Sequence, residues 1–461
     1  MLNKSAAELA LKKAVSTGGD FAEFFYEDTR RSSIAQNDDK IETAVTARNH
    51  GVGLRVYRDL NSVYVHSNDP SPEGLMKLAC DAADAIGSTA GGCRDVHLVE
   101  SVAPNIHVIK QMPMDVPGAK RAALVRNACR VMKDFSPEIA HTVASLLDWE
   151  QHVTICNTEG MFVNDIRVYS RAAVQAIASN GSENQVGFFG PGAMSGFELF
   201  EEQVDMEAAA KKAAQQAVTM LHGDLCPAGV MPVIIDGGFG GVIFHEACGH
   251  SLEATSVAFG NSEFCGKMGQ QIGSKKLTAI DDGTIPNNWG SENIDDEGNP
   301  TTKLVLIENG ILKNYMVDKL NARRMQLPVT GSARRQGYMY APTSRMRNTY
   351  IAAGEDDNNE IITTMGDGLY AKAMGGGSVE PSTGKFNFAV SEGYLVKDGK
   401  IVHPVRGASL IGRGSEILPK IDRVGRDMQM AQGMCGSLSG SVPTNVGQPM
   451  IRVTSLTVGG R

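Results

Sequence analysis

Residues 232–254 read PVIIDGGFGGVIFHEACGHSLEA, and this stretch changes from a strand pattern to a helix pattern. The apolar run at 232–236 predicts a buried strand, because it is short and ends at turn residues. Gly237 and Gly238 predict a tight turn, and a helix is expected to begin near Phe239. The helix then carries two histidines and two glutamates within nine residues, a density of ionisable groups that is unusual after so apolar a start.

Beyond this unit, the second half of the chain is dominated by short apolar runs separated by turn signals. Asn309-Gly310, Asp367-Gly368 and Asp398-Gly399 lie between such runs, and a Ser/Gly cluster occupies residues 436–441. Asn-Gly and Asp-Gly pairs between apolar runs are strong signals of hairpins. The second half is therefore predicted to be mostly antiparallel β structure, as a sandwich or a barrel, with one convincing helix.

The first half mixes helix and strand patterns. Apolar residues recur at helical spacing in 5–15, 71–86, 116–133 and 197–221, and strand-like runs occupy 22–29, 41–47, 51–57, 63–66 and 161–169. The helical pattern stops where HGDLCPAGV begins, at residue 222. We therefore predict an α+β protein, with an N-terminal mixed α/β domain at 1–225 and a β-rich C-terminal domain at 226–461.

Composition excludes several classes of function. The 461-residue chain has a formal charge of -8, which argues against a nucleic-acid binder that neutralises phosphates. It has no apolar run of the roughly 20 residues that a membrane span needs, and its N-terminus lacks the pattern of a signal peptide. The eight cysteines occur singly, which favours reduced thiols over disulfides. These features predict a cytoplasmic protein.

The segment His245-Glu246-Ala247-Cys248-Gly249-His250 has the residue types of a zinc peptidase. Such an enzyme uses neutral histidines as ligands and a carboxylate that takes a proton from the metal-bound water. In the familiar HExxH motif the histidines lie four residues apart on one helical face. Here they lie five apart, so on a regular helix they would point about 140° away from each other. Gly249 permits a local distortion, either a helix end or a π-type bulge, that would bring both histidines to one side.

Several segments of the second half resemble the TldD/PmbA family of metallopeptidases, in its motif-bearing, TldD-like branch. The resemblance rests on seven segments: HEACGHSLEA (245–254), DDGTIPNNWGSENIDDEGNPT (281–301), LIENGILKNYMVDKLNARRM (306–325), residues 370–377, GKFNFAVSEGYLV (384–396), PVRGASLIGRG (404–414) and GMCGSLSGSVPTNVGQPMIRVTSLTVGG (433–460). They follow in order through nearly the whole second half, which makes the resemblance specific.

The resemblance implies a site, an activity and partners. It assigns zinc to His245, His250 and Cys435, and the role of general base to Glu246. It further implies cleavage of unfolded or unstructured peptides, and a dimer, formed either with a second copy or with a PmbA-like subunit that lacks the metal motif.

The residues around the motif leave two further roles open. Cys435 lies in Gly433-Met434-Cys435-Gly436, which reads as a flexible loop able to bring a thiolate to a metal. Cys248 is a competing thiol, which we interpret as a small buried residue. Glu253 is either a further ligand or a carboxylate that orients an imidazole.

Two charged clusters are predicted to lie in solvent. Arg334, Arg335, Arg345 and Arg347 read as an exposed sheet edge, with binding of peptide termini or acidic substrate groups as the alternative. The acidic run at 295–297 reads as a solvated turn, with binding of a hard cation as the alternative. Two other functions compete with the peptidase: a binding protein without metal, and a metal-dependent hydrolase of small amides. Zinc is favoured over another divalent ion because the predicted ligands include a thiolate.

Overall fold

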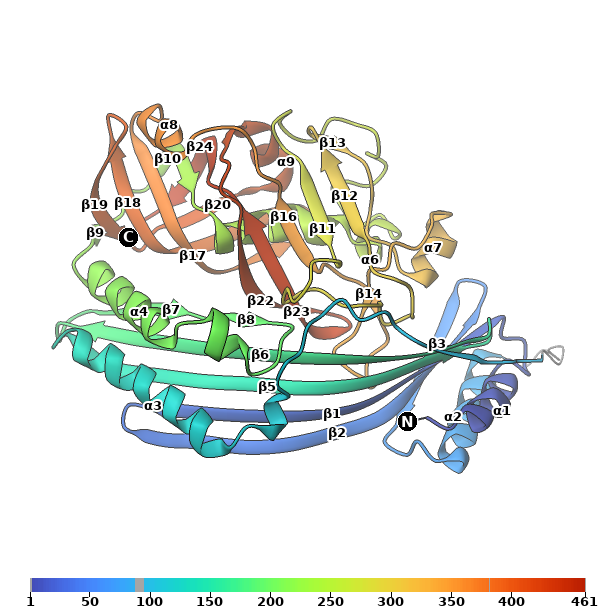
Figure 1. The fold of residues 1–461 in the computed structure, drawn as a ribbon. Helices are drawn as coiled ribbons and strands as arrows, with labels where there is room; N and C mark the ends of the chain where they lie inside the picture. Colours follow the sequence, from blue (N-terminus) through green and yellow to red (C-terminus); the bar gives the residue numbers. More distant parts are fainter. Residues whose placement is uncertain (1, 88–94, 381, 461) are drawn as a thin grey trace.

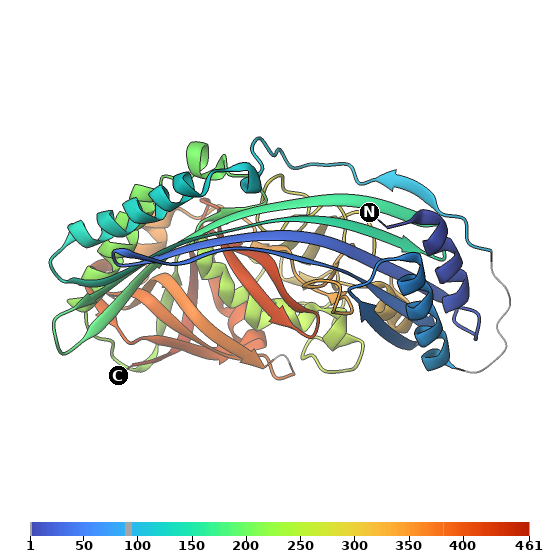
Figure 2. The ribbon, with the colours of Figure 1, turned by 90° about the horizontal axis from the view of Figure 1, so that it is seen from below.

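A computed structural model describes residues 2–87, 95–380 and 382–460, and it shows the α+β fold that the sequence predicts. A long, curved sheet built from the first half of the chain runs beneath a β-rich body built from the second half (Figure 1). Seen from below, the long strands of this sheet cross almost the full length of the molecule (Figure 2).

The first sheet has the strand order β3-β2-β1-β5-β6-β4, with β7 and β8 also paired to β6. Its strands are β1 Phe21–Asn37, β2 Lys40–Arg58, β3 Asn61–Ser67, β4 Val99–Val102, β5 Ile139–Asn157, β6 Met161–Ser179, β7 Asn184–Phe189 and β8 Gly192–Ala193. The strands predicted at 41–47 and 51–57 are one continuous strand, β2, which corrects the expected break. Gly51 pairs with Glu27 of β1 inside the strand, and its lack of a side chain leaves room for the ring of Tyr338.

Four helices cover one face of this sheet, and all four predicted helical segments are confirmed. They are α1 Lys4–Ala14, α2 Pro72–Ile86, α3 Gly118–Phe135 and α4 Met206–Leu221. The last begins later than expected, because Leu199–Gln203 forms a separate π-helical turn. Ser71 caps α2, since its side chain accepts a hydrogen bond from the Gly74 amide. Apolar residues of the sheet's outer face pack against α1 and α2 at one end and against α3 and α4 at the other.

The second half contains a barrel, one of the two predicted arrangements. Strands β10 Gly229–Ile235, β17 Gly368–Glu380, β18 Lys385–Lys397, β20 Ser409–Arg413 and β24 Ile451–Gly459 form a closed ring, because β17 also pairs with β18. Three short or peripheral strands extend it, namely β9 Asp224–Leu225, β19 Lys400–Arg406 and β21 Ile421–Val424. Most pairings are antiparallel, as expected, but β10–β17 and β9–β19 are parallel.

A second sheet lies beside the barrel, with the order β13-β12-β11-β16-β23-β22. Its strands are β11 Ala279–Asp282, β12 Lys303–Glu308, β13 Ile311–Leu312, β16 Asn348–Ile351, β22 Gln429–Ser437 and β23 Gly440–Gln448, and a separate pair joins β14 Ala333–Arg334 to β15 Thr343–Ser344. The predicted turns at Asn309-Gly310 and Asp398-Gly399 close the hairpins β12–β13 and β18–β19. The Ser/Gly cluster closes β22–β23.

The expectation of a single helix in the second half is wrong. Besides the helical segment around the histidines, α6 Ala254–Val257, α7 Lys319–Met325, α8 Asn358–Thr363 and α9 Gly414–Ile417 are present. Each is too short to show a helical period in the sequence. We keep the division into 1–225 and 226–461 as a proposal, since β1–β8 all belong to the first sheet.

The two charged clusters are buried rather than solvated, which corrects both predictions. Arg334, Arg335, Arg345 and Arg347 are at most 5% exposed, and residues 295–297 are at most 1% exposed. The reason is mutual neutralisation across the two halves of the chain. Arg55 of β2 contacts Glu297 at 2.5 Å, and Arg167 of β6 contacts Asp296 at 2.7 Å. Buried charges are stable when they are paired in this way.

The remaining sequence predictions concern thiols and membranes. The seven cysteines in the described ranges are free thiols, as predicted, while Cys93 lies outside these ranges. Within the same ranges, no helix combines the length and the apolar character that a bilayer span requires.

Candidate metal centre

The histidine motif lies on a helical segment that changes its winding as it crosses the motif. After β10, Gly238 turns the chain with a φ of 69° and begins a 3-10 turn, Gly238–Gly241. Helix α5, Val242–Phe244, leads into a π-helical turn, His245–Gly249, and then a 3-10 turn, His250–Leu252. The amide of His250 donates to the carbonyl of His245, so one wide turn contains the extra residue of the motif. This is the distortion that the five-residue spacing predicts.

Gly249 is needed here for space rather than for an unusual backbone angle. Its φ of -54° is ordinary for a helix. A Cβ at this position, however, would lie 2.2 Å from Sδ of Met346, which is itself fully buried. The close approach lets the π-helical turn pack directly on the strand region that precedes β16.

The turn brings both imidazoles to one thiol. Nε2 of His245 lies 3.2 Å from Sγ of Cys435, and Nε2 of His250 lies 3.3 Å from the same sulfur. One ligand atom from each of the three residues lies within 4.8 Å of the other two. The two rings are nearly perpendicular, with centroids 5.0 Å apart. The three predicted ligands, which are separated by up to 190 residues in the sequence, therefore converge.

Cys435 lies in strand β22, not in a flexible loop as the sequence suggested. It pairs in register with Val442 of β23 and is 5% exposed. The glycines at 433 and 436 misled the prediction, because they resemble loop residues but occupy a regular hairpin. A strand holds the thiol in a more fixed position than a loop can.

The buried side chain of Arg345 contacts both the β22–β23 hairpin and the segment that carries the histidines. Arg345 donates to the carbonyls of Cys435 and Gly440 and to Oγ of Ser439, and its Nε lies 3.9 Å from Oε1 of Glu253. The other oxygen of Glu253 lies 3.2 Å from Nδ1 of His250. Glu253 thus orients an imidazole through the nitrogen that faces away from the sulfur. Sequence reasoning missed Arg345, because nothing in its spacing distinguishes it from a surface arginine.

The electrostatics favour a thiolate between two histidines. Burial opposes ionisation of Cys435, but His245 and His250 outweigh it and hold the pKa of the thiol well below its usual value. Burial also opposes protonation of His250, yet Glu253 and Cys435 raise the pKa of this imidazole well above its usual value. The site therefore stabilises the sulfur in the anionic form that binds metals.

The carboxylate of Glu246 also lies near the place where His245, His250 and Cys435 converge. Its Oε2 lies 3.8 Å from Nε2 of His250, the ring nitrogen that faces Cys435. Its side chain is 23% exposed, more than that of His250 at 12%. Glu246 is therefore the member of the group that is best placed to meet a ligand arriving from solvent.

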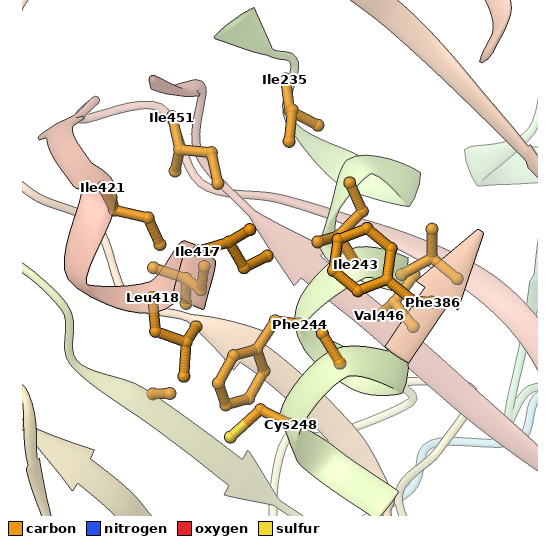
Figure 3. Packing of buried hydrophobic residues seen from close by; sticks show 14 of the residues in the cluster. Ile235, Ile243, Phe244, Cys248, Phe386, Ile417, Leu418, Ile421, Val446 and Ile451 are labelled. Atoms are coloured by element: carbon orange, nitrogen blue, oxygen red, sulfur yellow. The ribbon is translucent and has the colours of Figure 1, made fainter. Parts of the chain in front are cut away.

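Cys248 points into the hydrophobic core, away from the three convergent residues. It is fully buried beside Phe244 and near Leu418 (Figure 3). Burial raises the pKa of its thiol well above the usual value. It is the small buried residue that the sequence analysis expected.

The donor set fits a zinc ion. Two imidazole nitrogens and one thiolate are a typical set of three protein ligands for zinc, with a fourth position left for water or substrate. In a tetrahedral zinc site the nitrogen–sulfur separation is about 3.6 Å, and the separations here are 3.2 and 3.3 Å. A small outward movement of the side chains is enough to admit the ion.

Comparison with known proteins identifies the family. Family models match three consecutive parts of the chain: PmbA/TldA metallopeptidase domain 1 at 22–86, the central domain at 113–221 and the C-terminal domain at 228–460. The chain belongs to this metallopeptidase family. The predicted family membership is confirmed, and with it the predicted class of enzyme, a peptide hydrolase.

Individual proteins agree with this assignment. The Metalloprotease TldD homolog of Haemophilus influenzae is 34% identical over 96% of this chain and 93% of its own length. The Zinc metalloprotease TldD homolog of Saccharolobus solfataricus is 33% identical over 53% of this chain and 55% of its own length. The crystal structure of TldE from Thermococcus kodakarensis has the same fold, with a TM-score of 0.76 at 18% identity, covering 99% of this chain and 100% of that one.

The tight contact at Gly249 yields a test of the local geometry. We expect Gly249→Ala to displace the π-helical turn or Met346, because the new methyl group has no space. Such overpacking costs about 1–3 kcal/mol, and it should appear as a lower thermal midpoint together with weaker zinc retention. Gly376→Ala is the matched control, since no atom lies within 4 Å of the added group there. Equal midpoints for the two variants would contradict this account of Gly249.

Proposed function

We propose that the chain is a zinc-dependent metallopeptidase in which His245, His250 and Cys435 hold the ion and Glu246 is the general base. One observation carries the proposal. The carboxylate of Glu246 lies beside Nε2 of His250, at the point where both imidazoles and the thiolate converge. The family assignment supports the reaction class, and the name of the archaeal zinc metalloprotease relative supports the choice of metal.

Zinc, when bound, would act as a Lewis acid that lowers the pKa of a water molecule and stabilises negative charge on the peptide oxygen. The side chains of the protein supply the remaining functions. Glu246 would accept the proton of the attacking water and then deliver it to the leaving amine. Glu253 would keep Nδ1 of His250 engaged, which leaves Nε2 free as a ligand. Arg345 would hold the β22–β23 hairpin in place through its bonds to Cys435 and Gly440.

We further propose that the substrates are unfolded or unstructured peptides. Burial of the ligands supports this, since His245 and Cys435 are 3% and 5% exposed. A folded protein could not present a peptide bond to such a recessed site, whereas a single extended chain could enter it.

A dimer and a cytoplasmic location complete the proposal. The partner would be either a second copy or a subunit of the metal-free branch, and the close match to a TldE fold is consistent with the second arrangement. The charge of -8 argues against a nucleic-acid partner, and the free thiols are consistent with a cytoplasmic protein.

Elemental analysis tests the ligand set. We expect about one zinc ion per chain in the wild-type protein and loss of zinc in Cys435→Ala, because two histidines alone bind zinc weakly. Cys248→Ala is the matched control, since it removes a thiol from the π-helical turn that faces the core. If Cys248→Ala loses the metal and Cys435→Ala keeps it, the assignment of the thiol is wrong. A wild-type protein that takes up no zinc would favour the binding-protein alternative.

Peptide hydrolysis tests the general base. We expect Glu246→Gln to retain zinc and to lower the rate of cleavage by about 10²–10⁴-fold, the usual contribution of a general base. The assay should compare an unstructured peptide with the same sequence held in a folded domain, and a small amide such as an amino-acid anilide. Cleavage confined to the small amide would favour the amidase alternative. Full activity of Glu246→Gln with bound zinc would refute the proposed role.

A further inference from the structure

A cavity of about 290 Å³ lies between the inner face of the first sheet and the β22–β23 hairpin, and neither the motif nor the comparisons assign it a role. Residues of β1, β5 and β6 form one wall. Trp289 and residues of the hairpin, including Met434 and Val442, form the other. Met434 directly precedes Cys435 in β22, so the cavity and the metal centre share one strand.

Three aromatic rings in mutual contact form the base of the cavity. Trp149 and Tyr169 are cross-strand neighbours with centroids 4.7 Å apart. Trp289 meets both rings edge-on, with centroids 5.3 and 5.4 Å away. Its Nε1 donates to the carbonyl of Gly433 at 2.8 Å, which fixes the hairpin against the rings. The three rings are almost completely buried, and the hydroxyl of Tyr169 has no hydrogen-bond partner among the described residues.

Two arginines outside the buried ion-pair network lie above these rings. The guanidinium of Arg31 lies 5.8 Å from the ring centre of Trp149, and that of Arg171 lies 5.5 Å from that of Trp289. Within 2–87, 95–380 and 382–460, neither arginine has a carboxylate oxygen within 4.0 Å, although the charge of Arg31 acts on Glu27 and opposes the rise that burial causes in the pKa of that carboxyl. The buried Nε of Arg171 has no hydrogen-bond acceptor. Burial, with no compensating acid, lowers the pKa of Arg171.

The other charges of the cavity do not neutralise this pair. Arg167, Arg334 and Arg335 also line it, but each is already paired with a carboxylate of the buried network. Glu292 is the one acidic lining residue in the described ranges, and it is bound by Arg334 and Arg347. The positive charge of Arg171 and Arg31 therefore favours an anionic ligand in this cavity.

We propose that this cavity binds a carboxylate of the peptide substrate, with Arg171 and Arg31 as its partners. The inference rests on the proposed peptidase function. Arginine matches a carboxylate with two parallel hydrogen bonds, and the buried rings beneath Arg31 and Arg171 hold both guanidinium groups at the cavity. Both an α-carboxylate at the C-terminus and an acidic side chain carry this group, and the experiment separates the two sources.

Tryptophan fluorescence reads this site directly, because the chain has two tryptophans and both line the cavity. The full-length protein carrying Glu246→Gln is titrated with three peptides: acetyl-Ala-Ala-Phe with a free carboxylate, the same peptide as an amide, and acetyl-Ala-Glu-Phe-amide. Mass spectrometry confirms that each peptide stays intact. Failure of binding is thereby separated from failure of the peptidase proposal, which the cleavage assay tests on its own.

We expect a saturable change in tryptophan emission with one or both acidic peptides. The neutral amide should bind at least about tenfold more weakly, because it lacks the charge-assisted hydrogen bond. The free-carboxylate peptide identifies a site for the C-terminus, and the glutamate peptide a site for a side chain. Arg171→Gln should reduce the affinity for the acidic peptide to that of the neutral amide.

Two further variants complete the test. Arg31→Gln changes an exposed side chain, so it should fold normally and weaken binding of the acidic peptide in the same direction. Arg126→Gln, on the exposed side of α3, is the matched control and should bind like the parent protein. Equal affinity for all three peptides, or unchanged affinity in both cavity variants, overturns the proposal. It is also overturned if inorganic phosphate changes the emission and the peptides do not.

Discussion

Convergence of three side chains on one point depends on the π-helical turn at His245–Gly249. Five residues separate the two histidines, and a regular helix would direct their rings apart. The wide turn directs both Nε2 atoms at Cys435. The surrounding residues fit this turn. Gly249 leaves room for Met346, and Cys248 and Phe244 pack into the hydrophobic core. The β22–β23 hairpin places the thiol of Cys435 beside the two imidazoles.

The β22–β23 hairpin is held in place by buried polar and aromatic contacts with both halves of the chain. Arg345 connects it to Glu253, and thereby to His250. Trp289 connects its other side to the aromatic rings on the inner face of the first sheet. That face also carries Arg55 and Arg167, whose partners lie in the second half of the chain. The first sheet is therefore a structural support for the metal centre, although none of the three convergent residues comes from it.

Much of this arrangement could be predicted from the sequence. Local patterns indicated the four long helices, the hairpins closed by Asn-Gly and Asp-Gly, and the distortion at Gly249. The resemblance to a family indicated Cys435, which no local pattern could connect with a motif 185 residues earlier. Burial of charge could not be predicted. Arg345 and the run at 295–297 look like surface residues, because a sequence shows which side chains are charged but not which opposite charge meets them.

The placement of Cys435 in a strand also escaped prediction, since flanking glycines suggest a loop when they are seen without their partner strand. The cavity beside it depends on three strands and a distant tryptophan, and therefore exists only in the folded chain. In each of these cases the missing information was a contact between segments far apart in the sequence. The parts that were predicted correctly depend on neighbours along the chain.

X-ray absorption at the zinc edge tests the central claim most directly, because it reports the atoms bound to the metal in the intact protein. The account predicts one sulfur at about 2.3 Å and about three nitrogen or oxygen ligands near 2.0–2.1 Å, of which two show the scattering pattern of imidazole. A first shell without sulfur, or one with imidazole scattering absent, would contradict the proposed site at His245, His250 and Cys435.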